Sequence, residues 1–524
     1  MENKRGLVPR KIKGFRDIDA NLNELRWNII NKASKVYQSY GFEHLDTPIL
    51  EYAECLGKYM PDEDTVDKGV YSFKNPEIEP VFRADGKREL RDADNNVVMD
   101  HAHLSLRYDL TAPLSRVYAE RLWTRFLKKQ LVEGTAPLFR RYQFGPVFRY
   151  ETKLDPGRFR QFWQLDFDTV GSADVAADAE VCMILSDALK AIGLAQSDFK
   201  IRVNNRKILK GFLHDQGITT PIQEQAILRV IDKLDKIGLR GVEFELGKGR
   251  KDKSGAIIPG LGLEEKMISD FISFFEIFSE SNMNRGQVIE ALGGKIGTNE
   301  VSKEGLQELN RINSVLAQSG LSDEAVLFDP TLVRGMAYYT GPIFEVESTQ
   351  HYLDAKGRER RVGSICGGGR YDGLVKQLLG VTAPATGASI GVDRLAELLT
   401  LTNKGGTAQG PLLITVLDKE MMPEYQKIAK ELREGGVNTE VYYGPNQGFK
   451  KLKKQLSYAD DKNCPIIILL GSDEFEKGVV SVRDLKMGRE IADEVTDKKE
   501  WRARVQHEVP RTDLVSFVNK ILNK

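Results

Sequence analysis

The stretch Phe-Arg-Tyr-Glu-Thr-Lys-Leu-Asp-Pro-Gly-Arg-Phe-Arg-Gln-Phe-Trp-Gln, residues 148–164, alternates arginines, acids, amides and aromatics. Residues 142–150 and 160–170 have strand character, and Leu-Asp-Pro-Gly between them is a turn signal, so the stretch predicts a β-hairpin. Side chains two residues apart on a strand share a face. The polar side chains that we expect to converge are Arg149, Glu151, Arg158, Arg160 and Gln164. Guanidinium groups suit phosphate oxygens, so the hairpin predicts a nucleotide site, although plain surface hairpins also alternate charges.

The same residues match motif 2 of the class II aminoacyl-tRNA synthetases, which is an Arg-x-Glu, a loop and a Gly-Arg-Phe-Arg-Gln-Phe return strand. Two further stretches resemble the histidyl-tRNA synthetases, namely Arg-Gly-Met-Ala-Tyr-Tyr at 334–339 and Gly-Gly-Gly-Arg-Tyr-Asp-Gly-Leu at 367–374. The other matching segments are Lys-Gly-Phe-Arg-Asp at 13–17, Leu-Arg-Tyr-Asp-Leu-Thr-Ala-Pro at 106–113 and Gly-Ala-Ser-Ile-Gly-Val-Asp-Arg-Leu, which resembles motif 3, at 387–395. The resemblance covers nearly the whole chain.

This resemblance implies an α+β fold, with a class II antiparallel-sheet catalytic domain, a helical insertion and a C-terminal α/β anticodon-binding domain. The boundaries that we predict are residues 1–195 and 323–400 for the catalytic domain, 196–322 for the insertion, 401–410 for a linker and 411–524 for the anticodon-binding domain. Apolar spacing predicts insertion helices at 222–234, 264–279 and 301–316, and the Gly/Lys-rich residues 247–255 read as a loop. Residues 70–170 read mainly as short strands.

Composition sets broader limits. Lys+Arg and Asp+Glu both number 76 in 524 residues, so a nucleic-acid partner has to be held by local patches. The four cysteines lack metal-ligand spacing, which argues against structural zinc and for a reducing compartment. No apolar run approaches the length of a membrane span, and no signal-peptide core follows the first residues, so we expect a cytoplasmic protein.

Amino-acid activation joins a carboxylate to the α-phosphorus of ATP and expels pyrophosphate. The nucleophile comes with the substrate, so the protein has to align the reactants and stabilise the charge that builds on the phosphate oxygens. The resemblance implies that Arg149 binds the α-phosphate and the amino-acid carboxylate. It implies that Arg158 assists the pyrophosphate end and that Arg394 binds the γ-phosphate. Glu151 and Phe162 would hold the adenine.

The family's distinctive extra arginine corresponds to Arg334, which the resemblance places at the α-phosphate. Together with Arg149 it is the catalytic residue we predict, and we expect its loss to damage adenylation most. Magnesium should accompany ATP, with ligands that the sequence leaves unassigned.

For the amino acid, the resemblance implies that Asp109, Thr111 and Gln164 take the α-ammonium of histidine, because each offers an oxygen acceptor. The imidazole would be read by Asp168 and Tyr339, with Tyr338 beside them.

Two stretches depart from the family's pattern. Ala337 stands where the family usually has Asp, which removes a carboxylate beside the expected histidine pocket. The loop at 152–156 lacks the Arg-Pro-Gln pattern with which many bacterial relatives help to read the extra 5′ nucleotide of histidine tRNA. We expect recognition of that nucleotide to be relaxed or carried elsewhere.

The expected partners are histidine tRNA and a second copy of the chain. Residues 22–48 resemble motif 1, which forms the dimer interface of class II synthetases, although an amphipathic helix by default packs on its own core. Candidate tRNA contacts are Lys153, Lys450, Lys453 and Lys454. A basic helix with Arg229, Lys233, Lys236 and Arg240 is a further candidate, and a solvated face is the plainer interpretation of both lysine-rich segments.

Three rival functions share parts of this pattern: a regulatory paralogue of histidine biosynthesis, a binding-only RNA chaperone, and a synthetase for another amino acid. The first typically lacks the C-terminal domain and the ATP-binding arginines, the second leaves the converging arginines unexplained, and the third does not fit the Arg-Gly-x-x-Tyr-Tyr stretch. The histidine ligase is therefore the function that the sequence predicts.

Overall fold

The computed structural model of the chain divides into two compact units, Met1–Gly406 and Thr407–Lys524, and each is described by itself. The residues that it describes are 9–53, 55, 69–80, 89–92, 94–132, 135–151, 154, 157–252, 255–279, 283–297, 299–333, 339–353, 356–406, 409–492, 494–495 and 497–523. Among the helices within these ranges, none is both long and apolar enough to cross a membrane.

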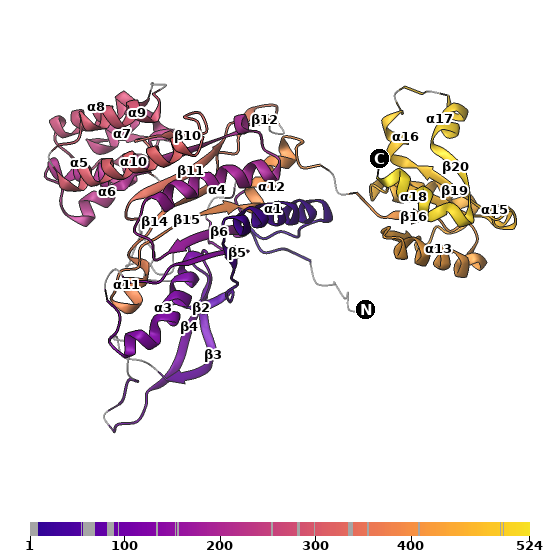
Figure 1. Cartoon of the computed structure of the whole chain (residues 1–524), viewed down its shortest axis with the longest axis horizontal. Coiled ribbons are helices and arrows are strands. Elements are labelled where there is room, and N and C mark those ends of the chain that lie inside the picture. The colour runs from indigo at the N-terminus through magenta and orange to yellow at the C-terminus, as the bar shows by residue number, and fades with distance from the viewer. Residues whose placement is uncertain are drawn as a thin grey trace, which may run out of the picture. The chain divides into compact units, whose positions relative to one another are not determined.

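The first unit is built on an eight-stranded sheet (Figure 1). Its strands, in spatial order, are β1 (Glu43–His44), β5 (Phe139–Phe148), β6 (Gln161–Val170), β15 (Ala385–Gly391), β14 (Ser364–Arg370), β11 (Pro342–Ser348), β7 (Phe199–Asn205) and β10 (Val326–Phe328). Neighbours are antiparallel except for the two edge pairs, β1 with β5 and β10 with β7. The predicted antiparallel sheet and the hairpin of β5 and β6 are confirmed.

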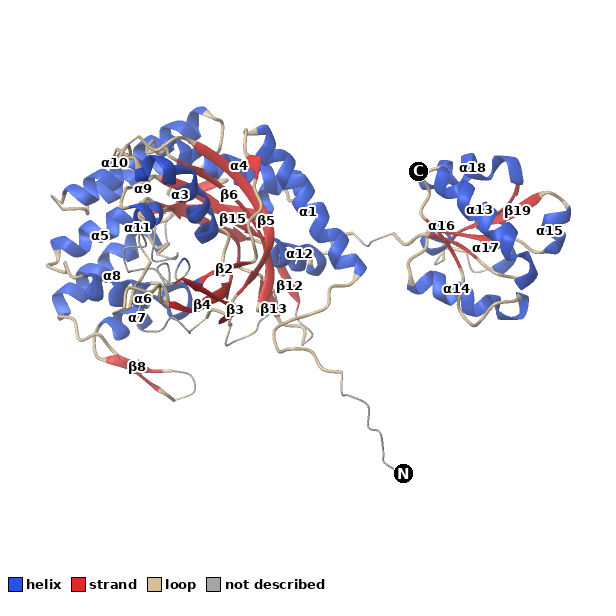
Figure 2. Ribbon diagram, turned by 90° about the horizontal axis from the view of Figure 1, so that it is seen from below, coloured by secondary structure: helices blue, strands red, loops and turns tan. Residues whose placement is uncertain are grey.

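Helices cover one face of this sheet. They are α1 (Ala20–Ser39), α4 (Ala176–Ile192) and α12 (Val392–Leu401), which pack on one another and on the strands (Figures 1 and 2). The Asp19 carboxylate caps α1 by accepting from the Leu22 N–H at 2.8 Å, and buried residues recur at helical spacing up to Tyr37. The ring of Tyr37 lies 4.7 Å from that of Phe167 on β6. The apolar side of β6 therefore faces the helices, and its polar side faces away from them.

A smaller three-stranded sheet lies beside the first, formed by β2 (Leu50–Tyr52), β4 (Met99–Leu106) and β3 (Ser72–Pro80). The prediction that residues 70–170 are mainly strands is wrong for α3 (Thr111–Leu127), which packs against α11 (Leu374–Leu379). The helix begins where Asp109 Oδ1 accepts from the Ala112 N–H at 3.0 Å, and Pro113 sits in its first turn, where a missing N–H costs nothing.

A helical block follows β7 in the chain. It consists of α5 (Arg206–Asp215), α6 (Pro221–Ile231), α7 (Leu234–Leu246), α8 (Glu265–Ser279), α9 (Arg285–Gly293) and α10 (Glu300–Gln318). The predicted loop at 247–255 is instead part of a hairpin of β8 (Gly249–Lys251) and β9 (Ile257–Pro259). The predicted basic helix is also wrong, because α6 ends before Lys233, and Gly238 interrupts α7 with a φ of 69°. The Lys233 ammonium binds the buried Glu245 carboxylate at 2.7 Å, so it is already paired.

The second unit has a five-stranded sheet in the order β17 (Thr439–Val441), β16 (Leu412–Ile414), β18 (Ile466–Leu469), β19 (Val479–Asp484) and β20 (Gln506–Pro510). Its first three strands are parallel and the others antiparallel, which confirms the predicted small α/β domain. Its helices are α13 (Met422–Glu434), α14 (Leu452–Asp461), α15 (Ser472–Glu476), α16 (Leu485–Glu490), α17 (Lys498–Val505) and α18 (Leu514–Leu522). The last segment, for which the sequence suggested no role, adds an edge strand and a helix to the core through Val509, Leu514 and Val518.

Candidate active site

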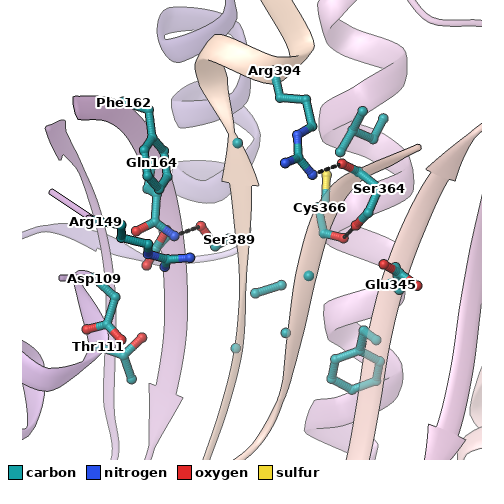
Figure 3. A pocket seen from close by; sticks show the side chains of 18 of the residues that line it. Asp109, Thr111, Arg149, Phe162, Gln164, Glu345, Ser364, Cys366, Ser389 and Arg394 are labelled. Carbon is teal, nitrogen blue, oxygen red and sulfur yellow. Dashed lines mark hydrogen bonds between the residues drawn. The ribbon is translucent and has the colours of Figure 1, made fainter. Parts of the chain in front are cut away.

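A cavity of ≈ 350 Å³ lies in the first unit, on the face of the large sheet that points away from α1 (Figure 3). That volume is in the range of sites for small ligands. The strand register aligns one row of residues across it: Gln143 on β5, Asp166 on β6, Ser389 on β15, Gly367 on β14, Glu345 on β11 and Arg202 on β7. The floor of the cavity is therefore polar at both sides and bare in the middle.

Glycines line the middle of the cavity floor, and they differ in whether the surrounding protein leaves space for a Cβ atom. A Cβ on Gly387 would lie 2.3 Å from Asp168 Oδ1, and one on Gly369 would lie 2.8 Å from the Tyr339 ring. A Cβ on Gly367 would meet no heavy atom nearer than the Phe344 carbonyl oxygen at 3.9 Å. Gly387 and Gly369 are therefore needed for packing, whereas the absence of a side chain at Gly367 leaves space that only a ligand would use.

Three arginines crowd one end of the cavity. Burial lowers the pKa of Arg394, and repulsion from Arg158 and Arg149 lowers it further, while Glu151 and Glu345 act in the opposite direction. The Arg394 Nη1 donates to the Ser364 carbonyl at 2.7 Å, and the Arg149 Nε donates to the Tyr108 carbonyl at 3.1 Å. Like charges held together in a cavity create a site for a polyanion.

The residue before Arg394 fixes this end of the cavity. Asp393 Oδ1 accepts from Arg26 at 2.7 Å and from Arg16 at 3.2 Å, and its Oδ2 accepts from the Trp163 N–H at 2.5 Å. The Arg16 guanidinium also lies over the Phe159 ring at 3.7 Å. The segment 13–17, which we singled out only by resemblance, thus joins the return strand of the hairpin to α12.

The opposite end of the cavity is acidic. Gln164, Asp166 and Asp168 occupy alternate positions of β6 and line the cavity. Asp168 forms an ion pair with the fully buried Arg141 at 3.0 Å and accepts a hydrogen bond from the Tyr371 hydroxyl. Burial raises the pKa of Asp168, and it raises the pKa of Asp166 to about 7. Acceptors for a cationic or N–H-bearing ligand therefore stand beside the arginine end.

Most of the predicted site residues come together. The cavity is lined by Asp109, Thr111, Arg149, Glu151, Arg158, Phe162, Gln164, Asp168, Tyr339 and Arg394. Arg160 does not join them, because it precedes the first residue of β6, where the alternation begins; its Nε donates to the Glu151 carbonyl at 3.1 Å and its chain packs over Gly14. Lys153, Arg334, Ala337 and Tyr338 lie outside the described residues. In the second unit, Lys450, Lys453 and Lys454 are exposed around the start of α14.

Sequence reasoning missed several residues of the site, among them Asp166, Glu345 and Ser389, which line the cavity, and Arg141, which pairs with Asp168. Asp166 could have been found, because it lies halfway between Gln164 and Asp168 on the same strand face. Glu345 and Ser389 reach the cavity through the order of the strands, which no local pattern contains.

The antiparallel sheet, the arginine-bearing hairpin and the arginine that begins α12 define the catalytic domain of a class II aminoacyl-tRNA synthetase. A family model described as Histidyl-tRNA synthetase matches residues 79–395, and one described as Anticodon binding domain matches residues 411–521. The chain belongs to the histidyl-tRNA synthetase family. It activates L-histidine with ATP to histidyl-adenylate and pyrophosphate, and then transfers histidine to the 3′ end of histidine tRNA.

Relatives match over nearly the whole length. The histidine–tRNA ligase of Paracoccus denitrificans is 44% identical over 514 residues and covers 97% of both chains. That of a Ruegeria species is 43% identical, over 97% of this chain and 95% of the relative. The crystal structure of histidyl-tRNA synthetase from a Nostoc species matches with a TM-score of 0.67 at 25% identity, over 98% of this chain and 100% of that one.

Proposed function

We propose that the arginine end of the cavity binds the triphosphate of ATP. The observation that carries this assignment is the crowding of Arg149, Arg158 and Arg394, which lowers the pKa of Arg394. Phosphate oxygens bound between the guanidinium groups would offset their mutual repulsion and accept charge-assisted hydrogen bonds from them. The Arg149 guanidinium lies 5.2 Å from the Phe162 ring, so it would take the α-phosphate while Phe162 and Glu151 hold the adenine.

The acidic end then takes histidine. Gln164 donates through Nε2 to Ser389 Oγ at 2.8 Å and lines the cavity together with Asp109 and Thr111, so these three side chains would take the α-ammonium. Asp168, held by Arg141 and Tyr371, would read the imidazole together with Tyr339, and the same role for Tyr338 remains a prediction. The substrate carboxylate falls between the two ends, beside Arg149.

The catalytic role of Arg334 remains a prediction, and the ends of its segment support it. Leu332 and Tyr339 both line the cavity. The Asn204 Nδ2 donates to the carbonyl oxygens of Pro330 at 3.2 Å and Leu332 at 2.8 Å, which fixes the approach to the segment. A guanidinium delivered from this position would stabilise charge on the α-phosphate in the transition state.

Magnesium fits as a companion of ATP. Within the described ranges no three His, Cys, Asp or Glu side chains are grouped as metal ligands. Mg²⁺ is commonly bound by one or two carboxylates together with substrate phosphates, and Glu151 and Glu345 are the carboxylates that act on Arg394. Because Glu151 is assigned to the adenine, Glu345 would hold the ion, whose chemistry is neutralisation of charge on the phosphate oxygens.

Partners and location follow from the same assignment. The insertion that meets the acceptor arm lies within the predicted range 196–322 but starts later than predicted, because β7 (Phe199–Asn205) is a strand of the large sheet. The linker at 401–410 leads to residues 411–524, which bind the anticodon, and the large-sheet unit catalyses. Lys153 and the exposed Lys450, Lys453 and Lys454 would contact tRNA phosphates.

A homodimer is proposed through α1 and the β1 edge, where the Trp27 side chain remains 41% exposed beside the aromatic rings of Phe144 and Trp163. The protein would work in the cytoplasm, and the thiols of Cys182, Cys366 and Cys464 are buried and free. Sedimentation of the purified chain tests the dimer, since a species with the mass of one chain at micromolar concentration would contradict it.

The test of the catalytic assignment is ATP–pyrophosphate exchange with each of the twenty amino acids. We expect exchange with histidine alone, and a fall in kcat of roughly 10²- to 10³-fold in Arg334→Ala. Arg394→Ala should chiefly raise the KM for ATP. The matched control is Arg311→Ala on α10, whose side chain is 58% exposed, and it should leave exchange unchanged. Undiminished exchange in folded Arg334→Ala and Arg394→Ala would refute the assignment.

A further inference from the structure

Arg206 lies where the large sheet passes into the helical block. It is the first residue of α5 and directly follows β7, and its side chain is half-buried. None of the substrate contacts proposed above involves it. Removing a guanidinium from water costs free energy unless its donors are used, so the contacts of Arg206 indicate its role.

The start of α5 gives Arg206 a fixed base. Asn205 Oδ1 accepts from the Lys207 N–H at 3.0 Å and so caps the helix. Asn205 Nδ2 donates to Glu308 on α10 at 2.6 Å, and the Lys207 ammonium binds the same carboxylate at 2.6 Å. Because both neighbours of Arg206 are tied to α10, the helical block sets the position of its backbone.

Arg206 contacts the segment that carries Tyr339. Its backbone N–H donates to the Gly341 carbonyl oxygen at 3.0 Å, and its Nη1 donates to the Tyr339 carbonyl oxygen at 3.4 Å. Burial lowers the pKa of Arg206, while the Tyr339 phenol and Glu224 on α6 act in the opposite direction. The guanidinium is therefore within electrostatic range of both the backbone and the side chain of Tyr339.

The large sheet holds the same segment from the other side. The Thr340 N–H donates to the Arg370 carbonyl oxygen of β14 at 2.8 Å, and a Cβ on Gly369 would lie 2.8 Å from the Tyr339 ring. The C=O and N–H of one trans peptide group point in opposite directions. The peptide group that joins Tyr339 to Thr340 is thus bound at both ends, by Arg206 and by Arg370, and Tyr339 itself lines the cavity.

We propose that Arg206 is a positioning residue for histidine recognition, which holds the peptide group of Tyr339 so that the Tyr339 side chain stays against the substrate imidazole. The proposal rests on the assignment of the acidic end to histidine. Arg206 does not touch the substrate and acts only through Tyr339. The planar guanidinium presents its donors in a fixed fork, so a lysine ammonium would replace it only in part.

The test compares Arg206→Met with the full-length wild-type protein. In calorimetric titrations the variant should bind histidine roughly 5- to 50-fold more weakly, and in pyrophosphate exchange its KM for ATP should stay within about threefold of wild type. Arg206→Lys should fall between the two proteins. Lys210→Met, at an exposed position of α5, is the matched control and should behave as wild type. Unchanged affinity for histidine, or an equal rise in the KM of both substrates, would overturn the proposal.

A double-mutant cycle with Tyr339→Phe gives a readout that a merely structural role would not move. The Phe variant lacks the hydroxyl that meets the imidazole, so Arg206 has nothing left to position. Adding Arg206→Met to it should weaken histidine binding by less than about threefold. If Arg206→Met does not fold, Arg206→Gln takes its place in the cycle. Full additivity of the two changes would overturn the proposal, and so would wild-type affinity in Tyr339→Phe.

Failure of this proposal is distinguishable from failure of the proposed function. Wild type that exchanges with no amino acid would remove the function itself. Wild type that exchanges with histidine, together with an Arg206→Met variant of equal histidine affinity, would remove only the role of Arg206.

Discussion

Replacing Gly367 by Ala should damage catalysis without damaging the fold. The added Cβ would be 3.9 Å from its nearest protein atom, the Phe344 carbonyl oxygen, and the φ of Gly367 is not positive. A Gly→Ala change at a compatible position stabilises a protein by about 0.4–1 kcal/mol through the entropy of the unfolded chain. The free energy of unfolding should therefore stay the same or rise by that amount.

The new methyl group would instead occupy the cavity, between Ser389 and Glu345 in the row that crosses the sheet. Forcing an extra methyl into a filled site costs about 1–3 kcal/mol, which corresponds to roughly a 5- to 150-fold fall in kcat/KM. Pyrophosphate exchange with histidine measures this loss, and chemical denaturation measures the stability.

Gly387→Ala is the contrasting variant. Its Cβ would lie 2.3 Å from Asp168 Oδ1 and 2.4 Å from the Phe167 carbonyl oxygen, so the backbone has to shift and the protein should lose stability as well as activity. If Gly367→Ala unfolded as readily as Gly387→Ala, or if it kept full kcat/KM, the interpretation of the bare middle of the cavity as substrate space would be refuted.

Three further predictions follow from the charges of the site. Asp393→Asn removes the partner of Arg26 and Arg16 and should lower the free energy of unfolding by about 3–5 kcal/mol, measured by denaturant titration; a loss below 1 kcal/mol would mean that the cluster is not a buried ion pair in solution. The pKa of an aspartate is about 3.9 in an unfolded chain, and burial raises the pKa of Asp166 to about 7 in the folded protein. Between these values the folded protein binds the extra proton, so the free energy of unfolding should fall as the pH rises from about 4 to about 7. Asp166→Asn should flatten this slope. Pyrophosphate at 100 times its Kd should stabilise wild type by about 2.7 kcal/mol in thermal melts, and the same concentration should stabilise Arg394→Ala much less; equal stabilisation of both would place the anion elsewhere.

The sequence predicted those features whose signals lie within one short stretch of the chain. The hairpin of β5 and β6 could be predicted because the turn signal and the alternation lie within one stretch, and motif resemblance then brought Asp109 and Arg394 to the same site. Sequence-based prediction failed where the position of a side chain depends on the exact residue at which a strand begins. Arg160 has the right parity for the cavity face, but the strand begins one residue later, so its side chain leaves the row.

Tertiary context decided the rest. α3 was missed because its first turn is stabilised by Asp109 and its buried face packs on α11, neither of which appears as a strong local signal. The row from Gln143 to Arg202 joins six strands, of which the hairpin of β5 and β6 is separated by many residues from β7 and from β11, β14 and β15, and only the register of the sheet aligns it. Local pattern therefore predicts members of the site, and sheet order predicts their neighbours.

The opposed charges of the cavity explain why one arrangement of substrates is favoured. Triphosphate repels the acids around Asp166 and is attracted by Arg158 and Arg394, while an α-ammonium has the opposite preferences. Histidine is itself a dipole, with its carboxylate next to its ammonium. Once the ammonium lies among the acids, the carboxylate has to point toward the arginines, and Arg149 meets it there together with the α-phosphate. The polarity of the site alone thus aligns the nucleophile with the phosphorus it attacks, before any group on the protein has to move.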